Sequence, residues 1–250
     1  YQIRGYYQMI TFILTVYEWT LFLIVCIVLY PIALIIFLFT ALFDRRKVVL
    51  HSFSCFWASL YIWLQPLWKV TWEGKEYIKK DQAYVIVSNH QALLDILVIY
   101  SLFKHFKWVA KSSLLKVPFV GWNMALNGYI IVKRTDTKSQ IKMMKHSERT
   151  LKAGSSVMIF PEGTRSTDGT IGRFKRGAFI LSEIADVPVI PIALYNMDKA
   201  VKKNSLWLNK VTDMKAKVFP PVNPKDFNNT KEMSAAVKDI IANQLEKWRI

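Results

Sequence analysis

An uncharged stretch of 25 residues near the start of the sequence, Trp19 to Phe43, restricts most strongly what this chain can fold into. As a helix it measures about 37 Å, against about 30 Å for the hydrocarbon core of a bilayer. The stretch is much longer than the apolar core of a signal peptide and lacks a small-residue cleavage site, so we expect it to be retained. Pro31, in its middle, predicts a kink or a break in the helix.

A second uncharged run, Val48 to Trp68, follows a charged cluster and is rich in Trp, Tyr and Phe. Such residues concentrate at membrane interfaces rather than in the hydrocarbon. The two runs could form one span with an interfacial helix, two spans, or a helical hairpin embedded in one leaflet. Two spans would place the basic residues Arg45 to Lys47 on the side opposite to the rest of the chain, which the positive-inside rule disfavours. We favour the embedded hairpin over a single span, and both over the buried core of a soluble protein.

The charge of the chain lies outside this apolar segment. The net charge is +16, from 34 basic and 18 acidic residues, and only Arg4 and Glu18 precede Asp44. A strongly basic domain indicates a polyanionic partner. Next to an apolar segment, a membrane with anionic lipid is a better candidate than nucleic acid, because juxtamembrane Lys and Arg bind acidic headgroups. Cys26 and Cys55 both lie in apolar runs, and we expect them to be core residues.

From Lys69 onward, short runs rich in β-branched residues alternate with helical patterns. Strands are expected at 69–74, 83–88, 106–110, 128–132, 156–160, 188–194 and 215–219, and helices at 93–104, 117–126, 137–153, 175–185 and 231–248. This alternation predicts an α/β fold with a mostly parallel sheet flanked by helices. An apolar two-helix membrane-anchoring module precedes it. We therefore divide the chain into an anchor, residues 1–68, and an α/β domain, residues 69–250.

Several polar residues follow the predicted strands, where ligands bind in sheets of this kind. His90 lies on the turn between strand 83–88 and the next helix, and Asp95 lies in the first turns of that helix. The carboxylate can therefore fold back onto the imidazole, hold its tautomer and stabilise the imidazolium that forms when the ring takes up a proton. Lys111 follows the next strand, and Lys133 with Arg134 follows a third. A His-x4-Asp pair alone is a weak motif.

The segment Phe160 to Ser166 adds a second motif after another strand. Gly163 lets a ligand approach the backbone, Thr164 and Ser166 offer hydroxyls, and the guanidinium of Arg165 suits phosphate or carboxylate. Together with Asn89-His90-x4-Asp95, this segment resembles the glycerolipid acyltransferase family. Two further blocks, Gly128 to Arg134 and Val187 to Ile192, are similar to blocks of that family and occur in the same order.

This resemblance implies transfer of a fatty acyl group from a thioester to the sn-2 hydroxyl of 1-acyl-sn-glycerol 3-phosphate, which gives phosphatidic acid. By the resemblance, His90 is the general base and Asp95 orients its ring. Lys111, or backbone N–H groups beside it, stabilises the oxyanion. The substrate-binding residues are those expected to hold phosphate or the glycerol backbone: Lys133, Arg134, Glu162, Gly163, Thr164 and Arg165, with Lys175 and Arg176 as further candidates. Glu162 binds the glycerol backbone or braces a basic neighbour.

The remaining expectations concern the donor, the acyl chain and the location. The donor is acyl-CoA or acyl carrier protein, with no cofactor and no metal, since His51, His105 and His146 lack ligand-spaced partners. The segment from Val117 to Trp122, with Met124, either lines an acyl slot or forms ordinary core. We expect the protein at the cell membrane, with its catalytic domain on the cytoplasmic face.

Three alternatives remain open. The acceptor could be glycerol 3-phosphate or another lysophospholipid, because the same base would serve each. A hydrolase could use that base on water. A protein of another class, a membrane-anchored basic protein that binds acidic lipid or nucleic acid, would explain the charge but not the four ordered blocks.

Overall fold

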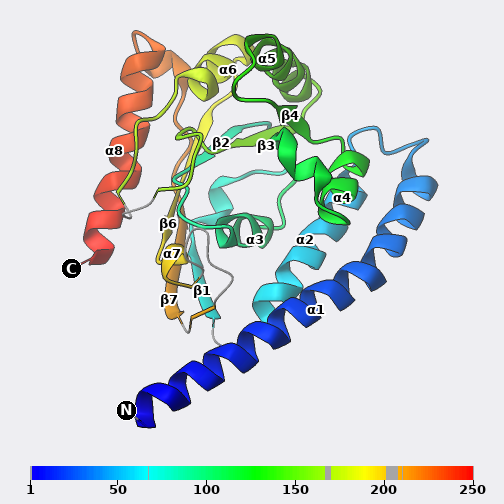
Figure 1. The fold of residues 1–250 in the computed structure, drawn as a ribbon. Helices are drawn as coiled ribbons and strands as arrows, with labels where there is room; N and C mark the ends of the chain where they lie inside the picture. Colours follow the sequence, from blue (N-terminus) through cyan, green and yellow to red (C-terminus); the bar gives the residue numbers. More distant parts are fainter. Residues whose placement is uncertain (1, 67, 167–169, 201–207, 210, 250) are drawn as a thin grey trace.

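A single mixed sheet lies between two layers of helices in the computed structural model, which describes residues 2–66, 68–166, 170–200, 208–209 and 211–249 (Figure 1). The strands are β1 (Trp68–Glu73), β2 (Val85–Ser88), β3 (Phe106–Lys111), β4 (Ile130–Val132), β5 (Ser156–Ile159), β6 (Val189–Tyr195) and β7 (Val211–Val218). Their order across the sheet is β1-β7-β6-β2-β5-β3-β4. The strands from β6 to β4 run parallel, whereas β7 is antiparallel to β6 and β1 is parallel to β7.

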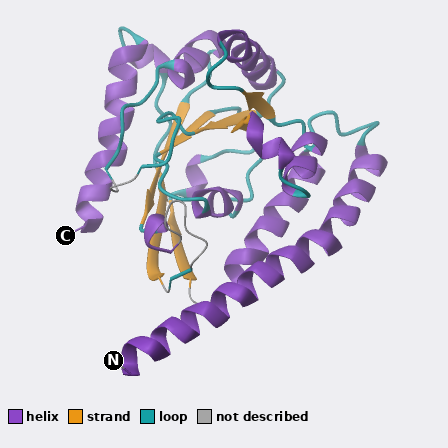
Figure 2. Ribbon diagram, in the orientation of Figure 1, coloured by secondary structure: helices purple, strands orange, loops and turns teal. Residues whose placement is uncertain are grey.

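The helices divide between the two faces of the sheet (Figure 2). They are α1 (Gln2–Thr40), α2 (Val48–Trp63), α3 (Leu94–Tyr100), α4 (Val120–Leu126), α5 (Thr137–Lys152), α6 (Gly177–Ala185), α7 (Met197–Ala200) and α8 (Thr230–Arg249). Short 3-10 helices occur at Lys75–Tyr77, Ser112–Lys116 and Pro224–Asp226. The mostly parallel α/β fold with apolar helices before it is confirmed.

The strand β2 shows how the two faces are built. Ile86 points into the core beneath α2 and α3, while its neighbours Val85 and Val87 point into the core beneath α5, α6 and α8. Alternate residues of a strand face opposite sides of the sheet, and all three side chains are fully buried. Because both faces of the central strands are covered, these strands are apolar throughout, as is typical of parallel sheets.

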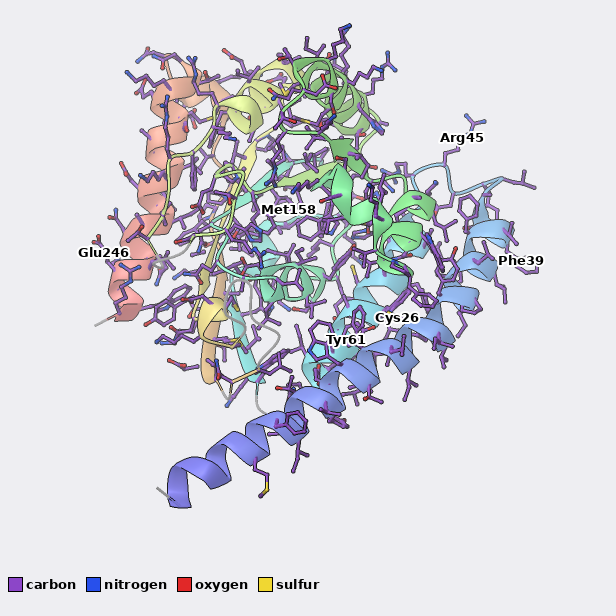
Figure 3. The ribbon with its side chains drawn as sticks, in the orientation of Figure 1. Cys26, Phe39, Arg45, Tyr61, Met158 and Glu246 are labelled. Carbon is purple, nitrogen blue, oxygen red and sulfur yellow. The ribbon has the colours of Figure 1, made fainter. Side chains whose placement is uncertain are left out.

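The helices α1 and α2 form a hairpin on the outer side of the α2–α3 layer. Cys26 of α1 lies against Tyr61 of α2, with 3.5 Å between the thiol sulfur and the hydroxyl oxygen, and Figure 3 shows both between the helices. Away from this contact α1 exposes an apolar face, at whose far end Phe39 is 77% exposed. Within the described residues, Phe12–Thr40 is long and apolar enough to cross a membrane. An exposed apolar face of this length is compatible with membrane association.

The connection between the two helices is held against the α/β domain. Arg46 donates from Nη1 to the carbonyl of Gly154, after α5, at 3.0 Å, and Lys47 donates from Nζ to the carbonyl of Leu126, at the end of α4, at 2.5 Å. Both contacts place a cation at the C-terminal end of a helix, where the helix dipole favours positive charge. The hairpin therefore lies along the domain and contacts it at its turn.

Several local expectations differ from the structure: β7 begins at Val211 rather than at 215, and α4 begins at Val120 rather than at 117. Of the kink or break expected at Pro31, the break is absent, since α1 continues to Thr40. On the two sides of the proline, Tyr30 packs on Phe119 and Ala33 is buried. The helix after His90 ends at Tyr100 rather than at 104. There the Ser101 hydroxyl donates to the carbonyl of Val98 at 2.7 Å, which competes with the helical hydrogen bonds.

Candidate active site

His90 and Asp95 meet at the carboxyl end of β2. The ring nitrogen Nδ1 of His90 lies 2.7 Å from Oδ2 of Asp95, and the same oxygen accepts hydrogen bonds from the backbone N–H groups of Gln91, at 2.6 Å, and Ala92, at 2.9 Å. The Asp95 side chain is fully buried, whereas that of His90 is 12% exposed. Since an ionised carboxylate only accepts, the neutral imidazole carries its proton on Nδ1, which leaves Nε2 as a proton acceptor.

Asn89 fixes the turn that carries His90. Its side-chain amide donates to the carbonyl of Leu194 and accepts from the N–H of the same residue, both at 2.9 Å. Leu194 belongs to β6, the strand beside β2. The two side-chain bonds therefore take the place of a pair of backbone hydrogen bonds between β2 and β6, just beyond the end of β2. Asn89 belongs to the sequence motif, but the sequence alone assigns it no role.

Aromatic rings form one wall of the site. The ring of Phe160 stacks on the imidazole of His90, with centroids 4.0 Å apart and planes 10° apart, and Trp108 of β3 lies on Phe160 at 5.7 Å. This contact fixes the plane of the imidazole, in addition to the hydrogen bond at Nδ1. This role of Phe160 and Trp108 was not predicted, because both residues lie in apolar runs that are equally typical of a buried strand.

Glu162 braces the same turn through the backbone. Its Oε1 accepts from the N–H of His90 at 2.9 Å, and its Oε2 accepts from the N–H of Gly172 at 2.8 Å. Burial raises the pKa of the Glu162 carboxyl, although both hydrogen bonds favour the charged form. In the opposite direction, the N–H of Ser166 donates to the carbonyl of His90 at 2.8 Å. The described residues 160–166 and 170–172 and the turn at His90 therefore hold each other in place.

A basic hollow of about 700 Å³ opens beside Glu162. We call this the basic hollow; it is lined by Glu162, Thr164, Arg165, Ser166, Thr170, Gly172, Arg173, Phe174, Lys175 and Arg176. Gly163 has a positive φ of 72°, which favours glycine, and a Cβ there would lie 2.8 Å from Nζ of Lys175, so a larger residue would displace the end of this lysine. The four cations, with the hydroxyls beside them, suit an anion with several oxygens, such as a phosphate.

The structure brings together only part of the predicted set. His90, Asp95, Glu162, Thr164 and Arg165 converge with Gly163 around the turn and the basic hollow. Arg173 was missed as a hollow-lining residue, although it lies in the same basic run as Lys175 and Arg176.

The other predicted cations lie at the same edge of the sheet but do not line the basic hollow. Lys111 is exposed at the end of β3, two strands from β2. Lys133 and Arg134 are exposed beyond β4, the outermost strand, and the separation of three strands corresponds to about 14 Å. Their assigned roles stay predictions.

The segment considered for an acyl slot packs on the hairpin. Phe119 and Trp122 contact the ring of Tyr30 in α1, with centroids 5.9 and 5.3 Å apart, and Trp122 remains 46% exposed. Met124 is buried in the core beneath α2 and α3. The segment therefore joins the hairpin to the α/β domain, and its part in binding an acyl chain stays a prediction.

An imidazole with one nitrogen held by a buried carboxylate, next to a basic hollow, defines a class of site: a general-base site that can deprotonate a hydroxyl of a phosphorylated molecule. The family model described as Acyltransferase matches residues 69–195, which contain all of these groups. The chain belongs to the acyltransferase family.

Named relatives agree with this family. The chain is 37% identical to a chloroplastic 1-acyl-sn-glycerol-3-phosphate acyltransferase of Brassica napus, over 74% of this chain and 54% of the relative. It is 29% identical to the 1-acyl-sn-glycerol-3-phosphate acyltransferase of Borreliella burgdorferi, over 76% of each chain. The chain thus spans about half the length of the plant relative. The crystal structure of the 1-acyl-sn-glycerophosphate acyltransferase PlsC of Thermotoga maritima has the same fold, with a TM-score of 0.80, 97% of each chain covered and 23% identity.

Proposed function

We propose that the protein transfers a fatty acyl group from a thioester to the sn-2 hydroxyl of 1-acyl-sn-glycerol 3-phosphate and so makes phosphatidic acid. The observation that carries this proposal is the His90–Asp95 pair beside a hollow with four cations. The substrate suggested by the names of the relatives has both groups that such a site needs, a free hydroxyl and a phosphate.

In the proposed reaction, Nε2 of His90 takes the proton of the acceptor hydroxyl as its oxygen attacks the thioester carbonyl. The tetrahedral intermediate then expels the thiolate, which takes the proton back from the imidazolium. Asp95 stabilises the imidazolium between these steps. General-base help of this kind contributes about 10²–10⁴ in rate, so positioning and oxyanion stabilisation supply the rest. Direct transfer is favoured because both cysteines are buried and so unsuited to carry an acyl intermediate.

The phosphate of the acceptor would lie in the basic hollow. Arg165, Arg173, Lys175 and Arg176 offer charge-assisted donors to its oxygens, and Thr164 offers a hydroxyl. We propose Lys111 as a group that stabilises the oxyanion, since it follows a neighbouring parallel strand at the same edge. Lys133 and Arg134 would add positive potential farther along that edge.

The hairpin would hold the enzyme at its substrate. We propose that α1 and α2 lie in one leaflet of the cell membrane, with the α/β domain on the cytoplasmic face and anionic lipid beneath it. Two observations support this topology: α1 exposes an apolar face, and Arg46 and Lys47 hold the hairpin turn against the domain instead of placing it across a bilayer. The donor would be acyl-CoA or acyl carrier protein.

The test is transfer of a radiolabelled acyl group to lysophosphatidic acid by the purified chain in nanodiscs. We expect His90→Ala to lower kcat at least 100-fold, because the base is lost. The matched control is His146→Ala, which removes an exposed histidine from α5 and should keep wild-type activity. Equal activity in wild type and His90→Ala would overturn the proposal.

The same assay separates the alternative reactions. Glycerol 3-phosphate and lysophosphatidylcholine, added as competing acceptors, test the acceptor; preference for either one over lysophosphatidic acid would contradict the proposed substrate. Release of free fatty acid without an acceptor, at the rate of transfer, would indicate a hydrolase. Absence of turnover with both donors would instead favour a binding protein.

A further inference from the structure

A second hollow lies between the basic run after Gly172 and the first turns of α8. We call it the α8 hollow; it measures about 400 Å³ and is lined by Arg173, Phe174, Arg176, Lys231, Ser234, Ala235 and Lys238. Three of these residues, Arg173, Phe174 and Arg176, also line the basic hollow, so the two hollows adjoin. Its volume lies within the range of small-molecule sites, about 300–1,000 Å³.

The positive charge of the α8 hollow is not balanced by a carboxylate in its lining. Among the described residues no acid lines it, and none of Arg173, Arg176, Lys231 and Lys238 forms an ion pair with a carboxylate of that part of the chain. On α8, Glu232 follows Lys231 and accepts instead from the backbone and side chain of Asn228, at 3.2 and 3.1 Å, and Asp239 follows Lys238 without an ion pair to it. Four cations held around one concave surface repel each other, and an anion with several charges would relieve this repulsion.

We propose that the α8 hollow binds the phosphate groups of the nucleotide part of coenzyme A, so that the acyl donor is an acyl-CoA. This inference rests on the proposed function and assigns the donor within it. The basic hollow, beside Glu162 and the turn of His90, would take the single phosphate of the acceptor. The adjoining α8 hollow would take the several phosphates at the far end of the donor. The flexible pantetheine chain of coenzyme A then brings the thioester back to His90.

The position of the α8 hollow suits a water-soluble group. The helix α8 packs on the face of the sheet opposite to α2 and α3, and the hairpin lies outside that other layer (Figure 1). A nucleotide at α8 would thus bind on the side away from the membrane-facing helix α1, while a lipid acceptor would approach from the hairpin side. The two substrates would not compete for the same entrance.

The shape of the surface favours coenzyme A over an acidic carrier protein. A carrier protein would bind to a convex surface, and the exposed basic stripe of α5, formed by Lys138, Lys142, Lys145 and Arg149, offers one. The α8 hollow is concave, and its cations, of which Arg173, Arg176 and Lys231 are exposed, surround one surface, which suits a small polyanion. The two surfaces share no residue, so substitutions can separate them.

The test uses the full chain in nanodiscs, with Lys231→Ala/Lys238→Ala as the variant. We expect its KM for acyl-CoA to rise about tenfold or more, since each lysine would donate charge-assisted hydrogen bonds to a phosphate and alanine cannot. Its kcat and its KM for lysophosphatidic acid should stay within twofold of wild type. With an acyl-pantetheine donor, which lacks the nucleotide, variant and wild type should have equal kcat/KM. The matched control, Lys142→Ala/Lys145→Ala, removes the same charge from α5 and should leave the KM for acyl-CoA unchanged.

Three results would overturn the inference: an unchanged KM for acyl-CoA in the variant, a rise confined to the KM for lysophosphatidic acid, or turnover with acyl carrier protein but not with acyl-CoA. Calorimetric binding of free coenzyme A gives a measurement that needs no turnover. If coenzyme A binds tenfold more weakly to the variant but no acceptor is acylated, the proposed function fails while the α8 hollow retains its ligand.

Discussion

Replacing Asp95 by Asn tests the charge of this carboxylate separately from its hydrogen bonds. All three hydrogen bonds of the side chain go to Oδ2, while Oδ1 is buried and has no partner among the described residues. An asparagine can therefore place its carbonyl oxygen at Oδ2 and its NH₂ group at Oδ1. The change keeps the contacts to His90, Gln91 and Ala92 and removes the negative charge.

The expected effect follows from the distance in the pair. Nδ1 of His90 and Oδ2 of Asp95 are 2.7 Å apart, which puts the centres of the two charges roughly 4 Å apart. At an effective dielectric constant of about 20, two unit charges at that distance attract by about 4 kcal/mol. If half to all of the imidazolium charge has formed in the transition state, Asp95→Asn loses about 2–4 kcal/mol, or roughly 30- to 1,000-fold in kcat.

The assay is acyl transfer to lysophosphatidic acid, with kcat and KM determined separately. Since Asp95 is fully buried, the KM for the acceptor should not change. Asp95→Ala is the comparison, because it also removes the acceptor for two backbone N–H groups and should lower the free energy of unfolding. A folded Asp95→Asn protein with kcat within threefold of wild type would refute the electrostatic role.

Two further predictions concern the surroundings of the site, and a third concerns Lys107, buried near the start of β3. Glu162→Gln keeps one acceptor oxygen for two N–H groups, so calorimetry should show about 1–3 kcal/mol less stability, and kcat should fall as the His90 turn loosens. Gly163→Ala should raise the KM for lysophosphatidic acid in the transfer assay, because its Cβ would displace Lys175. Burial lowers the pKa of Lys107 from 10.5 to about 8, so the unfolded chain holds this proton at a higher pH than the native protein does. Between pH 8 and 10.5 the stability of wild type relative to Lys107→Met should therefore rise, by up to roughly 3 kcal/mol, in denaturation at several pH values; a flat difference would contradict the shift.

The amino-acid sequence was enough to predict most helices and strands of this protein and the central pair of its site. Periodic apolar patterns are local, so strand and helix positions from 69 onward were predicted with errors of a few residues, as at β2 and α5. The pair His90 and Asp95 was also predictable, because both residues belong to one turn and the helix that follows it.

Contacts between distant segments became visible only in the folded chain. Two roles were open for Glu162 from the sequence, and in the fold its carboxylate accepts from the N–H of His90, 72 residues away. The α8 hollow combines Arg173 and Arg176 with Lys231 and Lys238, which come together only because α8 packs beside the segment before α6. Conversely, Lys133 and Arg134 lie at the predicted carboxyl edge of the sheet, but they follow β4, which is three strands away from β2 and His90. Local patterns specify which residues end a strand, whereas the order of strands in the sheet, which depends on long-range packing, sets which of those ends are neighbours.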